Sequence, residues 1–449
     1  MMLSSRISFS AFFIFLFILT GTSLSALARE LDLNVEKFTL SNGLTVLLHE
    51  DHSIPMVSYH TWYHVGSRDE QLGVTGAAHM LEHMMFKGAK KYSDKEFDQI
   101  LHKNGITNNA FTTADYTGFY ENLPSDKLEL IMDVEVDRMR DLAISSEALK
   151  SELQVVGEER RWRVDNNPVS LLRESMMEAL YKLHPYHWPV IGYMKDIQDY
   201  TPEKLREFYN RYYVPNNAIL VIAGDIQIPR VKELVSKYYG ELPSKPLPEH
   251  GYPQEPEPQQ AKRFVKEAEV QSSSVIVAYK TVAAGHPDQY ALDLAANLLG
   301  VGTSSRLHKS LVYQAQQATE VGAYSETTAD PGFFSLHAIL IPGKTTQQTE
   351  SIIEKEVAKL RSAKISAQEL KKVKNQIMKE YVEGLMTIDG QAQSLAVTEI
   401  LRGNYKSLFE DLDKYEKVTA GDIQRVANTY LKTNRRVTAI LNPQKGRIQ

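Results

Sequence analysis

The sequence predicts an α+β protein of two homologous domains, each a mainly antiparallel sheet packed with helices, joined by an extended linker. Three observations support this class: the second half repeats the pattern of the first, a proline-rich segment separates the repeats, and short strand-like runs alternate with helical stretches. Closely spaced strands favour antiparallel pairing over a doubly wound parallel sheet. A chain of 449 residues also exceeds one ordinary domain.

The repeat is clearest where a predicted helix leads into a predicted strand. Thr201–Leu205 corresponds to Thr419–Ile423 at an offset of 218 residues, and Ile219–Ala223 corresponds to Val437–Leu441 at the same offset. In each copy a threonine stands at the expected helix N-cap. One such pairing could arise by chance.

A second pairing, of residues 145–149 with 366–370, has a nearly equal offset and favours an internal duplication. Between the repeats, residues 240–262 are rich in proline, which disfavours helix interiors and central strands. We expect an extended linker there rather than a long loop within one domain. The predicted domains are therefore residues 29–239 and 263–449.

Periodicity places individual elements within these domains. A capping box at Ser93–Glu96 predicts a helix start, and residues 145–164 read as a helix with Ser145 or Ser146 at its N-cap. The strand-like runs are Leu44–Leu48, Val57–Tyr63, Phe119–Glu121, Ile219–Ala223 and Ser274–Tyr279.

The N-terminus has the pattern of a cleavable signal peptide over residues 1–28. Arg6 precedes an apolar run from Ile7 to Leu19, and Ala26-Leu27-Ala28 offers a small-x-small cleavage site after Ala28. The alternative is a membrane anchor, but the run is shorter than the roughly 20 residues that span a bilayer. We expect a periplasmic or secreted protein without a stable membrane anchor after cleavage.

Composition excludes several functional classes. The chain has no cysteine, which removes disulfides, thiolate metal sites and cysteine nucleophiles. Its net charge is −5, and it has no basic block with interleaved aromatic residues, so we do not expect nucleic acid as a partner.

The motif His79-Met-Leu-Glu82-His83 carries the predicted chemistry. On a helix, residues four apart lie on one face, so both imidazoles can bind one metal ion. Glu82 lies beside them and can take a proton from an activated water without being a ligand. This H-x-x-E-H order is the inverzincin signature. By itself the motif is also compatible with two ordinary helix histidines beside a solvated glutamate.

Zinc needs a third protein ligand, and the acidic helix of residues 145–164 can supply it. Glu152 and Glu159 are seven residues apart and share a face two turns apart, whereas Glu158 points elsewhere. One of the pair can bind the metal while the other supports a histidine from outside. The helix pattern does not decide which.

Two stretches resemble the pitrilysin/insulinase family of zinc metallopeptidases, in particular its processing-peptidase-like branch of two-domain subunits. They are Gly76–Gly88 and Glu152–Glu159; further similarity at Asn108–Thr113 and His184–Gly192 extends it from about residue 35 to the C-terminus. The resemblance implies one Zn²⁺ per chain.

It also implies specific roles. His79, His83 and Glu159 would be the zinc ligands, Glu82 the general base, and Glu152 the outer carboxylate. The segment Asn109–Ala110 would be an edge strand that takes up a substrate peptide by β-augmentation.

The second half departs from the family pattern. Its helical segment Ala291–Gly300 has no H-x-x-E-H. Active family members carry an Arg and a Tyr, seven apart, that contact substrate and the developing oxyanion; here those positions hold Val312 and Thr319. Arg306 and Tyr324 are nearby at the wrong spacing.

Because the family includes heterodimers whose second subunit supplies the Arg/Tyr pair, we expect this chain to be the zinc-bearing subunit of such a pair. It would hydrolyse short or unfolded peptides inside a clamshell chamber. A self-sufficient homo-oligomeric peptidase that uses Arg306 or Tyr324, and a non-catalytic peptide-binding subunit, are the alternatives.

Overall fold

The computed structural model describes residues 33–249, 251–252, 255–256 and 258–444, so the predicted signal peptide lies outside the described residues. The first half contains a six-stranded sheet with the order β1-β2-β6-β3-β5-β4. Its strands are β1 (Val35–Thr39), β2 (Thr45–Glu50), β3 (Met56–Tyr63), β4 (Thr107–Thr112), β5 (Thr117–Pro124) and β6 (Ala218–Gly224). Its helices are α2 (Ala77–Met84), α3 (Asp94–Asn104), α4 (Leu128–Asp141), α5 (Ser146–Arg160), α6 (Pro168–Leu180), α7 (Met194–Gln198), α8 (Pro202–Tyr212) and α9 (Ile228–Tyr239).

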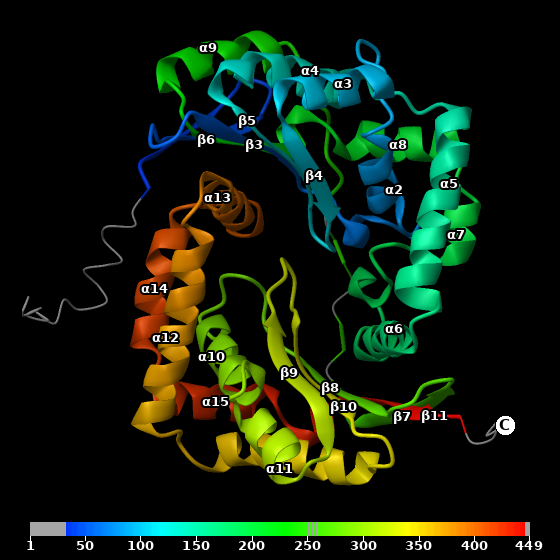
Figure 1. Ribbon diagram of the computed structural model, residues 1–449, viewed down its shortest axis with the longest axis vertical. Coiled ribbons are helices and arrows are strands. Elements are labelled where there is room, and N and C mark those ends of the chain that lie inside the picture. Colours follow the sequence, from blue (N-terminus) through cyan, green and yellow to red (C-terminus); the bar gives the residue numbers. More distant parts are fainter. Residues whose placement is uncertain (1–32, 250, 253–254, 257, 445–449) are drawn as a thin grey trace, which may run out of the picture.

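The second half contains a five-stranded sheet with the order β7-β11-β8-β10-β9 (Figure 1). Its strands are β7 (Lys262–Ala268), β8 (Ser274–Lys280), β9 (Ala318–Glu326), β10 (Phe333–Leu340) and β11 (Val437–Pro443). Its helices are α10 (Gln289–Gly300), α11 (Thr346–Ser362), α12 (Ala367–Gly384), α13 (Ile388–Arg402), α14 (Ser407–Lys417) and α15 (Ala420–Tyr430).

The two sheets share one topology, which confirms the predicted α+β class and its two similar halves. The order β2-β6-β3-β5-β4 matches β7-β11-β8-β10-β9, with β1 as an addition. In each sheet one pair is parallel, β2 with β6 and β7 with β11, and the other pairs are antiparallel. The helices before β6 and β11 begin at Thr201 and Thr419, whose side chains cap them as expected.

Local sequence signals explain most element boundaries. Ser93 and Glu96 form the predicted capping box of α3, and Ser145 caps α5. The helix expected over residues 145–164 is shorter than predicted: α5 ends at Arg160 and continues as a π-helical turn over Arg161–Asp165. The chain must leave the helix there because Pro168 begins α6 and disfavours helical geometry before it.

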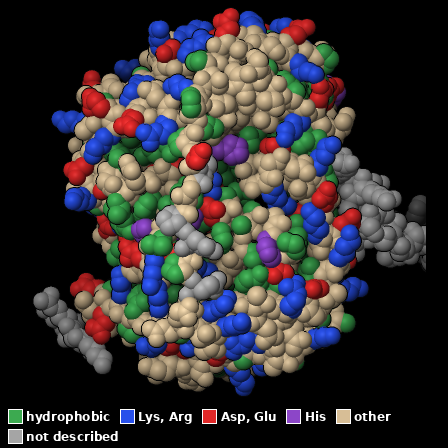
Figure 2. Space-filling model, turned by 180° about the vertical axis from the view of Figure 1, so that it is seen from behind, with side chains coloured by type: hydrophobic (Ala, Val, Ile, Leu, Met, Phe, Trp, Pro, Cys, Tyr) green, Lys and Arg blue, Asp and Glu red, His purple; other side chains and the backbone are tan. Residues whose placement is uncertain are grey.

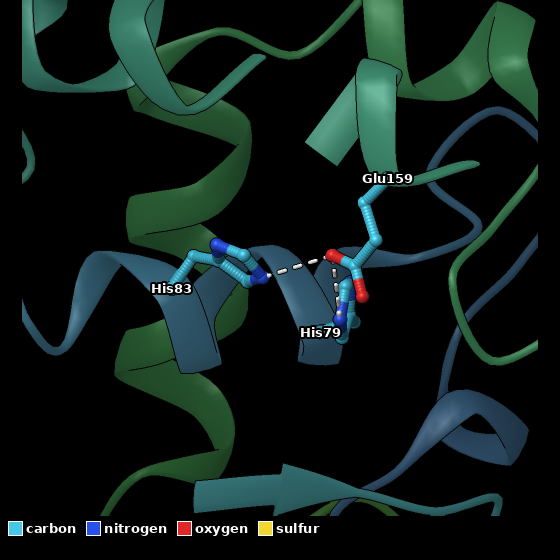
Figure 3. A group of neighbouring side chains, drawn as sticks. All are labelled: His79, His83 and Glu159. Carbon is cyan, nitrogen blue, oxygen red and sulfur yellow. Dashed lines mark ion pairs between the residues drawn. The ribbon is translucent and has the colours of Figure 1, made fainter. Parts of the chain in front are cut away.

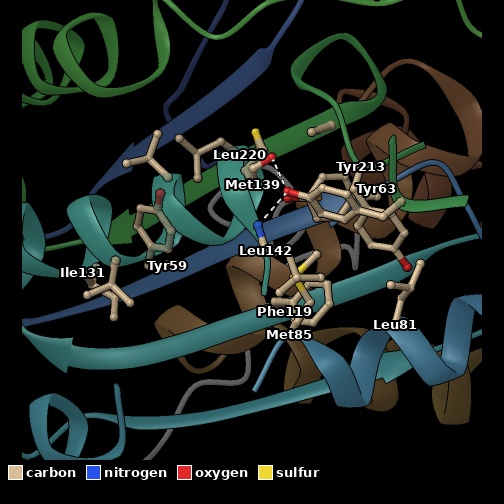
Figure 4. Packing of buried hydrophobic residues seen from close by; sticks show 14 of the residues in the cluster. Tyr59, Tyr63, Leu81, Met85, Phe119, Ile131, Met139, Leu142, Tyr213 and Leu220 are labelled. Atoms are coloured by element: carbon tan, nitrogen blue, oxygen red, sulfur yellow. Dashed lines mark hydrogen bonds between the residues drawn. The ribbon is translucent and has the colours of Figure 1, made fainter. Parts of the chain in front are cut away.

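The core of the first half lies between its sheet and the outer helices. Tyr59, Tyr63, Phe119 and Tyr213 pack there with aliphatic side chains (Figure 4), and the rings of Tyr63 and Tyr213 are 4.8 Å apart. Burying each large apolar side chain contributes about 1.5–3 kcal/mol. This core also holds Leu81 of α2, so it anchors the helix that carries the histidine motif.

One helix of each half packs on the sheet of the other half, an exchange that was not predicted from the sequence. Helix α13 packs on strands β3 and β6 of the first sheet, and α6 packs on β8 and β11 of the second (Figure 1). Residues buried beneath α13 include Leu47, Trp62 and Val221, and those beneath α6 include Ile276, Ala278 and Ala439. The halves are thus joined by two apolar interfaces in addition to the connecting chain.

Between Tyr239 and Lys262 the described residues form neither helix nor strand, and Lys262, which we expected in the linker, begins β7. On the face opposite to Figure 1, exposed hydrophobic side chains gather mainly in the middle band of the molecule (Figure 2). Within the described ranges, no helix is both long and apolar enough to cross a bilayer.

Candidate metal centre

Helix α2 is fixed at its N-terminus by two buried carboxylates. Glu70 accepts hydrogen bonds from the backbone N–H groups of Gly76 (2.7 Å) and Ala78 (2.9 Å). Asp196 accepts from the N–H and the hydroxyl of Thr75. These acceptors satisfy backbone N–H groups that the first turn of a helix leaves without partners. The position of the metal motif is therefore set by side chains outside the motif.

Glycine is required where α2 meets the segment before α7. Gly76 has φ +88°, and a Cβ there would lie 2.4 Å from the carbonyl oxygen of Ile191. A Cβ on Gly192 would lie 2.2 Å from the carbonyl oxygen of Thr75. Arg160 of α5 donates a hydrogen bond to the carbonyl of Gly192, which ties α5 to the start of α2.

The structure brings His79, His83 and Glu159 together (Figure 3). The Oε2 atom of Glu159 lies 3.3 Å from Nε2 of His83 and 3.7 Å from Nε2 of His79. Among the residues with described positions, this is the group of His, Asp and Glu side chains whose donor atoms converge closely enough to hold a metal ion.

These separations fit zinc. With bonds of about 2.0–2.1 Å in tetrahedral geometry, ligand atoms lie roughly 3.3 Å apart. The two distances from Glu159, 3.3 and 3.7 Å, are close to this value, and all three donor atoms lie within 4.8 Å of one another. Two neutral imidazoles and a carboxylate are also a donor set typical of zinc, and they leave a fourth position for water.

Glu152 supports His83 from the side away from this centre. Its Oε2 lies 3.1 Å from Nδ1 of His83, and its Oε1 lies 2.7 Å from Nζ of Lys87. When Nδ1–H donates to Glu152, the Nε2 lone pair of His83 points towards Glu159. Glu158, by contrast, is exposed and pairs with Arg161.

The two histidines differ in their pKa values because His79 is dominated by burial, whereas His83 has hydrogen bonds to two carboxylates. Burial and the neighbouring His83 lower the pKa of His79 to about 4. Burial also acts to lower the pKa of His83, but hydrogen bonds to Glu152 and Glu159 outweigh it and raise that pKa to about 9. Without a metal, His83 therefore carries a proton on both ring nitrogens at neutral pH, and a bound cation must displace the proton on Nε2.

Glu82 lies apart from the three converging groups, with its Oε2 accepting a 2.6 Å hydrogen bond from the hydroxyl of Thr112. Burial raises the pKa of Glu82, and the bond from Thr112 offsets part of that effect. A carboxylate with a raised pKa is well matched to proton transfer near neutral pH. Thr112 is the last residue of β4, so this strand positions the acid.

A cavity of about 820 Å³ opens over these groups. It is lined on one side by α2 and α5 and on the other by β4, including Asn109 and Ala110. Strand β4 is the edge of its sheet, so one side of its backbone faces away from the other strands. The residues expected to bind metal, protons and peptide thus surround one space.

The two positions at which the family's Arg and Tyr are expected, Val312 and Thr319, lie outside the cavity over the histidines. Val312 packs against the core of the second half, and the hydroxyl of Thr319 donates to the carbonyl of Ile339. Arg306 makes two hydrogen bonds with Glu369, and Tyr324 packs against Phe333. None of the four lines the cavity over the histidines.

Several residues of the centre were not assigned from the sequence. Thr112 and Lys87 lie within segments that resemble the family, but their hydrogen-bond partners follow only from the fold. Asp196 carried no spacing signal, because it acts across a tertiary contact with Thr75. Glu70 and Arg163 lie close in sequence to their partners, and the i,i+4 spacing of Glu159 and Arg163 is a signal that could have found Arg163.

Comparison with known proteins agrees with this architecture. The family model described as Insulinase (Peptidase family M16) matches residues 45–193, and the model described as Peptidase M16 inactive domain matches residues 199–377. The chain is 32% identical over 423 residues to the zinc protease PqqE of Helicobacter pylori, covering 91% of this chain and 93% of that protein. The chain belongs to peptidase family M16, the insulinase/pitrilysin family.

Other relatives extend the same similarity. The uncharacterized zinc protease YmxG of Bacillus subtilis is 25% identical over 415 residues, covering 91% of this chain and 98% of that protein. The crystal structure of a protease from Helicobacter pylori superimposes with a TM-score of 0.86 at 32% identity, covering 92% of this chain and all of that one. A Pseudomonas fluorescens structure titled as a peptidase M16 inactive domain, at 18% identity, a TM-score of 0.85 and coverage of 93% of this chain and all of that one, shares the fold.

Proposed function

We propose that this chain is a zinc-dependent endopeptidase that hydrolyses short or unfolded peptides. The observation that carries the proposal is the convergence of His79, His83 and Glu159, whose donor atoms all lie within 4.8 Å of one another, in a cavity that Glu82 also lines. Relatives over nine-tenths of the chain bear the name zinc protease, which supports the same activity.

In this proposal each group has one task. His79, His83 and Glu159 hold one zinc ion, which supplies Lewis-acid activation of water and of a carbonyl group. Glu82 takes a proton from the attacking water and returns it to the leaving amine. Thr112 keeps Glu82 oriented, and Glu152 keeps the Nε2 atom of His83 available to the metal.

The substrate would bind along β4. An extended peptide can add to an exposed sheet edge through main-chain hydrogen bonds. Because Asn109 and Ala110 line the cavity and precede Thr112 on the same strand, a peptide added there passes directly by Glu82. Only extended or unfolded segments can pair in this way.

We further propose that a homologous partner subunit supplies the Arg/Tyr pair, making this chain the zinc-bearing member of a heterodimer. Val312 and Thr319 stand where the pair is expected, and Arg306 is already bound to Glu369. A tetrahedral oxyanion needs donors beyond the metal, and this chain does not place the expected ones in its cavity.

Cleavage of the predicted signal peptide after Ala28 would deliver the chain to the periplasm or the medium.

The test is to measure zinc content and cleavage of an internally quenched peptide by the purified mature chain, alone and with the partner. We expect about one zinc per chain and slow turnover that rises when the partner is added. Full turnover without a partner would refute the heterodimer. Absence of bound zinc would refute the peptidase.

The matched variants are Glu82→Gln and Glu158→Gln. The first should retain zinc and lose activity by roughly 10²–10⁴-fold, as expected for a missing general base. The second variant removes the charge of Glu158, which is exposed and pairs with Arg161 outside the metal cavity. It should have the activity of the native chain. Equal activity in the two variants would contradict the role of Glu82.

A further inference from the structure

Two carboxylates of α5, Glu152 and Glu159, each contact histidine with one oxygen and a positively charged side chain with the other. Glu152 presents Oε2 to His83 and Oε1 to Lys87 (2.7 Å). Glu159 presents Oε2 to both histidines and Oε1 to Arg163 (2.8 Å). In both cases the oxygen that does not face a histidine is occupied by a positive group.

Arg163 lies four residues after Glu159, a spacing at which helical side chains face each other, and it belongs to the π-helical turn that follows α5. The turn spans Arg161–Asp165, and the Arg163 side chain lines the metal cavity although it is 63% exposed. Arg161, two residues earlier, points away and pairs with the exposed Glu158. One turn therefore carries two arginines, of which one faces the metal centre.

A carboxylate on a flexible side chain can rotate or turn towards water, and the ion pair between Nη1 of Arg163 and Oε1 of Glu159 restricts that motion. We propose that Arg163 is a positioning residue of the metal centre, holding Oε1 of Glu159 so that Oε2 stays directed at His79 and His83. Lys87 holds Glu152 in the same way and acts on the metal one step further out, through His83. The inference rests on the proposed metal-binding role of these groups.

Positioning and simple charge predict opposite results, which makes the inference testable. A positive group near a cation site repels the metal, so by charge alone the removal of Arg163 should tighten zinc binding. If Arg163 positions a ligand, its removal should weaken zinc binding, because contacts of this outer kind typically contribute ten- to hundredfold in metal affinity. The sign of the change decides between the two.

The experiment measures the zinc dissociation constant of the full mature chain by competition with a chromophoric chelator. We expect Arg163→Gln to weaken binding by about tenfold or more and Lys87→Gln by less. Arg161→Gln, which removes the same charge from the same turn, should leave the constant within about twofold of native, because the partner of Arg161 is Glu158, which does not line the metal cavity. Arg163→Lys, which keeps the charge but not the planar fork, should recover part of the loss.

Thermal unfolding of the metal-free proteins separates positioning from a general structural defect. Because the Arg163 side chain is mostly exposed, the Gln variant should unfold at the native temperature within about 1–2 °C. Zinc binding by Arg163→Gln as tight as native, or tighter, would overturn the inference. That outcome would leave the peptidase proposal intact, whereas failure of the native chain to bind zinc would remove both.

Discussion

Helices α5 and α12 occupy comparable places after the serine caps Ser145 and Ser366, yet of the two only α5 directs carboxylates at the candidate metal centre. Seven residues after the cap, α5 has Glu152, which faces His83, whereas α12 has Val373, which is fully buried in the core of the second half. Helix α10, against which α12 packs, is buried along almost its whole length.

This difference shows that the sheet order shared by the two halves can form without the polar side chains of the candidate metal centre. The second half reaches the same sheet order with an apolar residue at the position of Glu152. We infer that the carboxylates of α5 are present for chemistry rather than for stability. The predictions below test that separation.

The largest effect is expected at the metal ligands. His83→Ala removes one of three proposed ligands, so zinc affinity should fall by more than the ten- to hundredfold typical of outer contacts, and peptide cleavage should fall to background. Metal analysis and the quenched-peptide assay check this. His102→Ala, at an exposed position on α3, is the control and should bind zinc normally.

The next effect is on stability in the second half. Val373→Glu would place a carboxylate in a closed apolar core without a partner, which should cost about 3 kcal/mol or more in the free energy of unfolding. Urea denaturation measures it. A stability close to native would show that α12 can accept an acidic residue as α5 does, and would contradict the contrast between the helices.

The reverse substitution in the first half, which replaces the carboxylate of Glu152 by an apolar side chain, should weaken metal binding more than it lowers the stability of the fold. Glu152→Val should weaken zinc binding by about ten- to hundredfold, because His83 loses the contact that orients it. Chelator competition and urea denaturation on the same sample separate the two effects. If the main result were a loss of stability with zinc affinity unchanged, Glu152 would be a structural residue.

The smallest effect tests the equivalence of the halves. Thr201→Ala and Thr419→Ala each remove a side-chain cap from the helix that leads into the parallel strand. Each should cost about 1 kcal/mol of stability without altering zinc affinity. Calorimetry would show two similar downward shifts, and a large effect in one half alone would mean that the repeats are not energetically comparable.

The sequence predicted the fold class, the five strand-like runs and the caps at Ser93, Ser145, Thr201 and Thr419, because these depend on local patterns. It did not predict the exchange of α6 and α13 between the sheets. That exchange depends on how the halves pack, and an amphipathic helix has the same periodicity whichever sheet it covers.

For the candidate metal centre, as for the fold, the parts that depend on local sequence patterns were predicted. The histidine motif and the seven-residue spacing predicted two metal-binding histidines and a pair of carboxylates on one helix face, and the family resemblance implied Glu159 as the third ligand. In the structure Glu159 converges with both histidines and Glu152 contacts His83, while their roles toward a metal stay predictions. Thr112, Glu70 and Arg163 were not found. Thr112 acts on Glu82 from a different element, and Glu70 depends on the fold of the segment before α2, whereas Arg163 stands at an i,i+4 spacing from Glu159 that was available in the sequence. Spacing identifies ligands on one helix but not the contacts that hold them.

The most direct test is a crystal structure of the mature chain grown with zinc, with anomalous diffraction recorded at the zinc absorption edge. The account predicts one strong peak about 2.0–2.2 Å from Nε2 of His79, Nε2 of His83 and Oε2 of Glu159, with Arg163 still bound to Oε1. A peak elsewhere, or a Glu159 side chain turned away from both histidines, would contradict it.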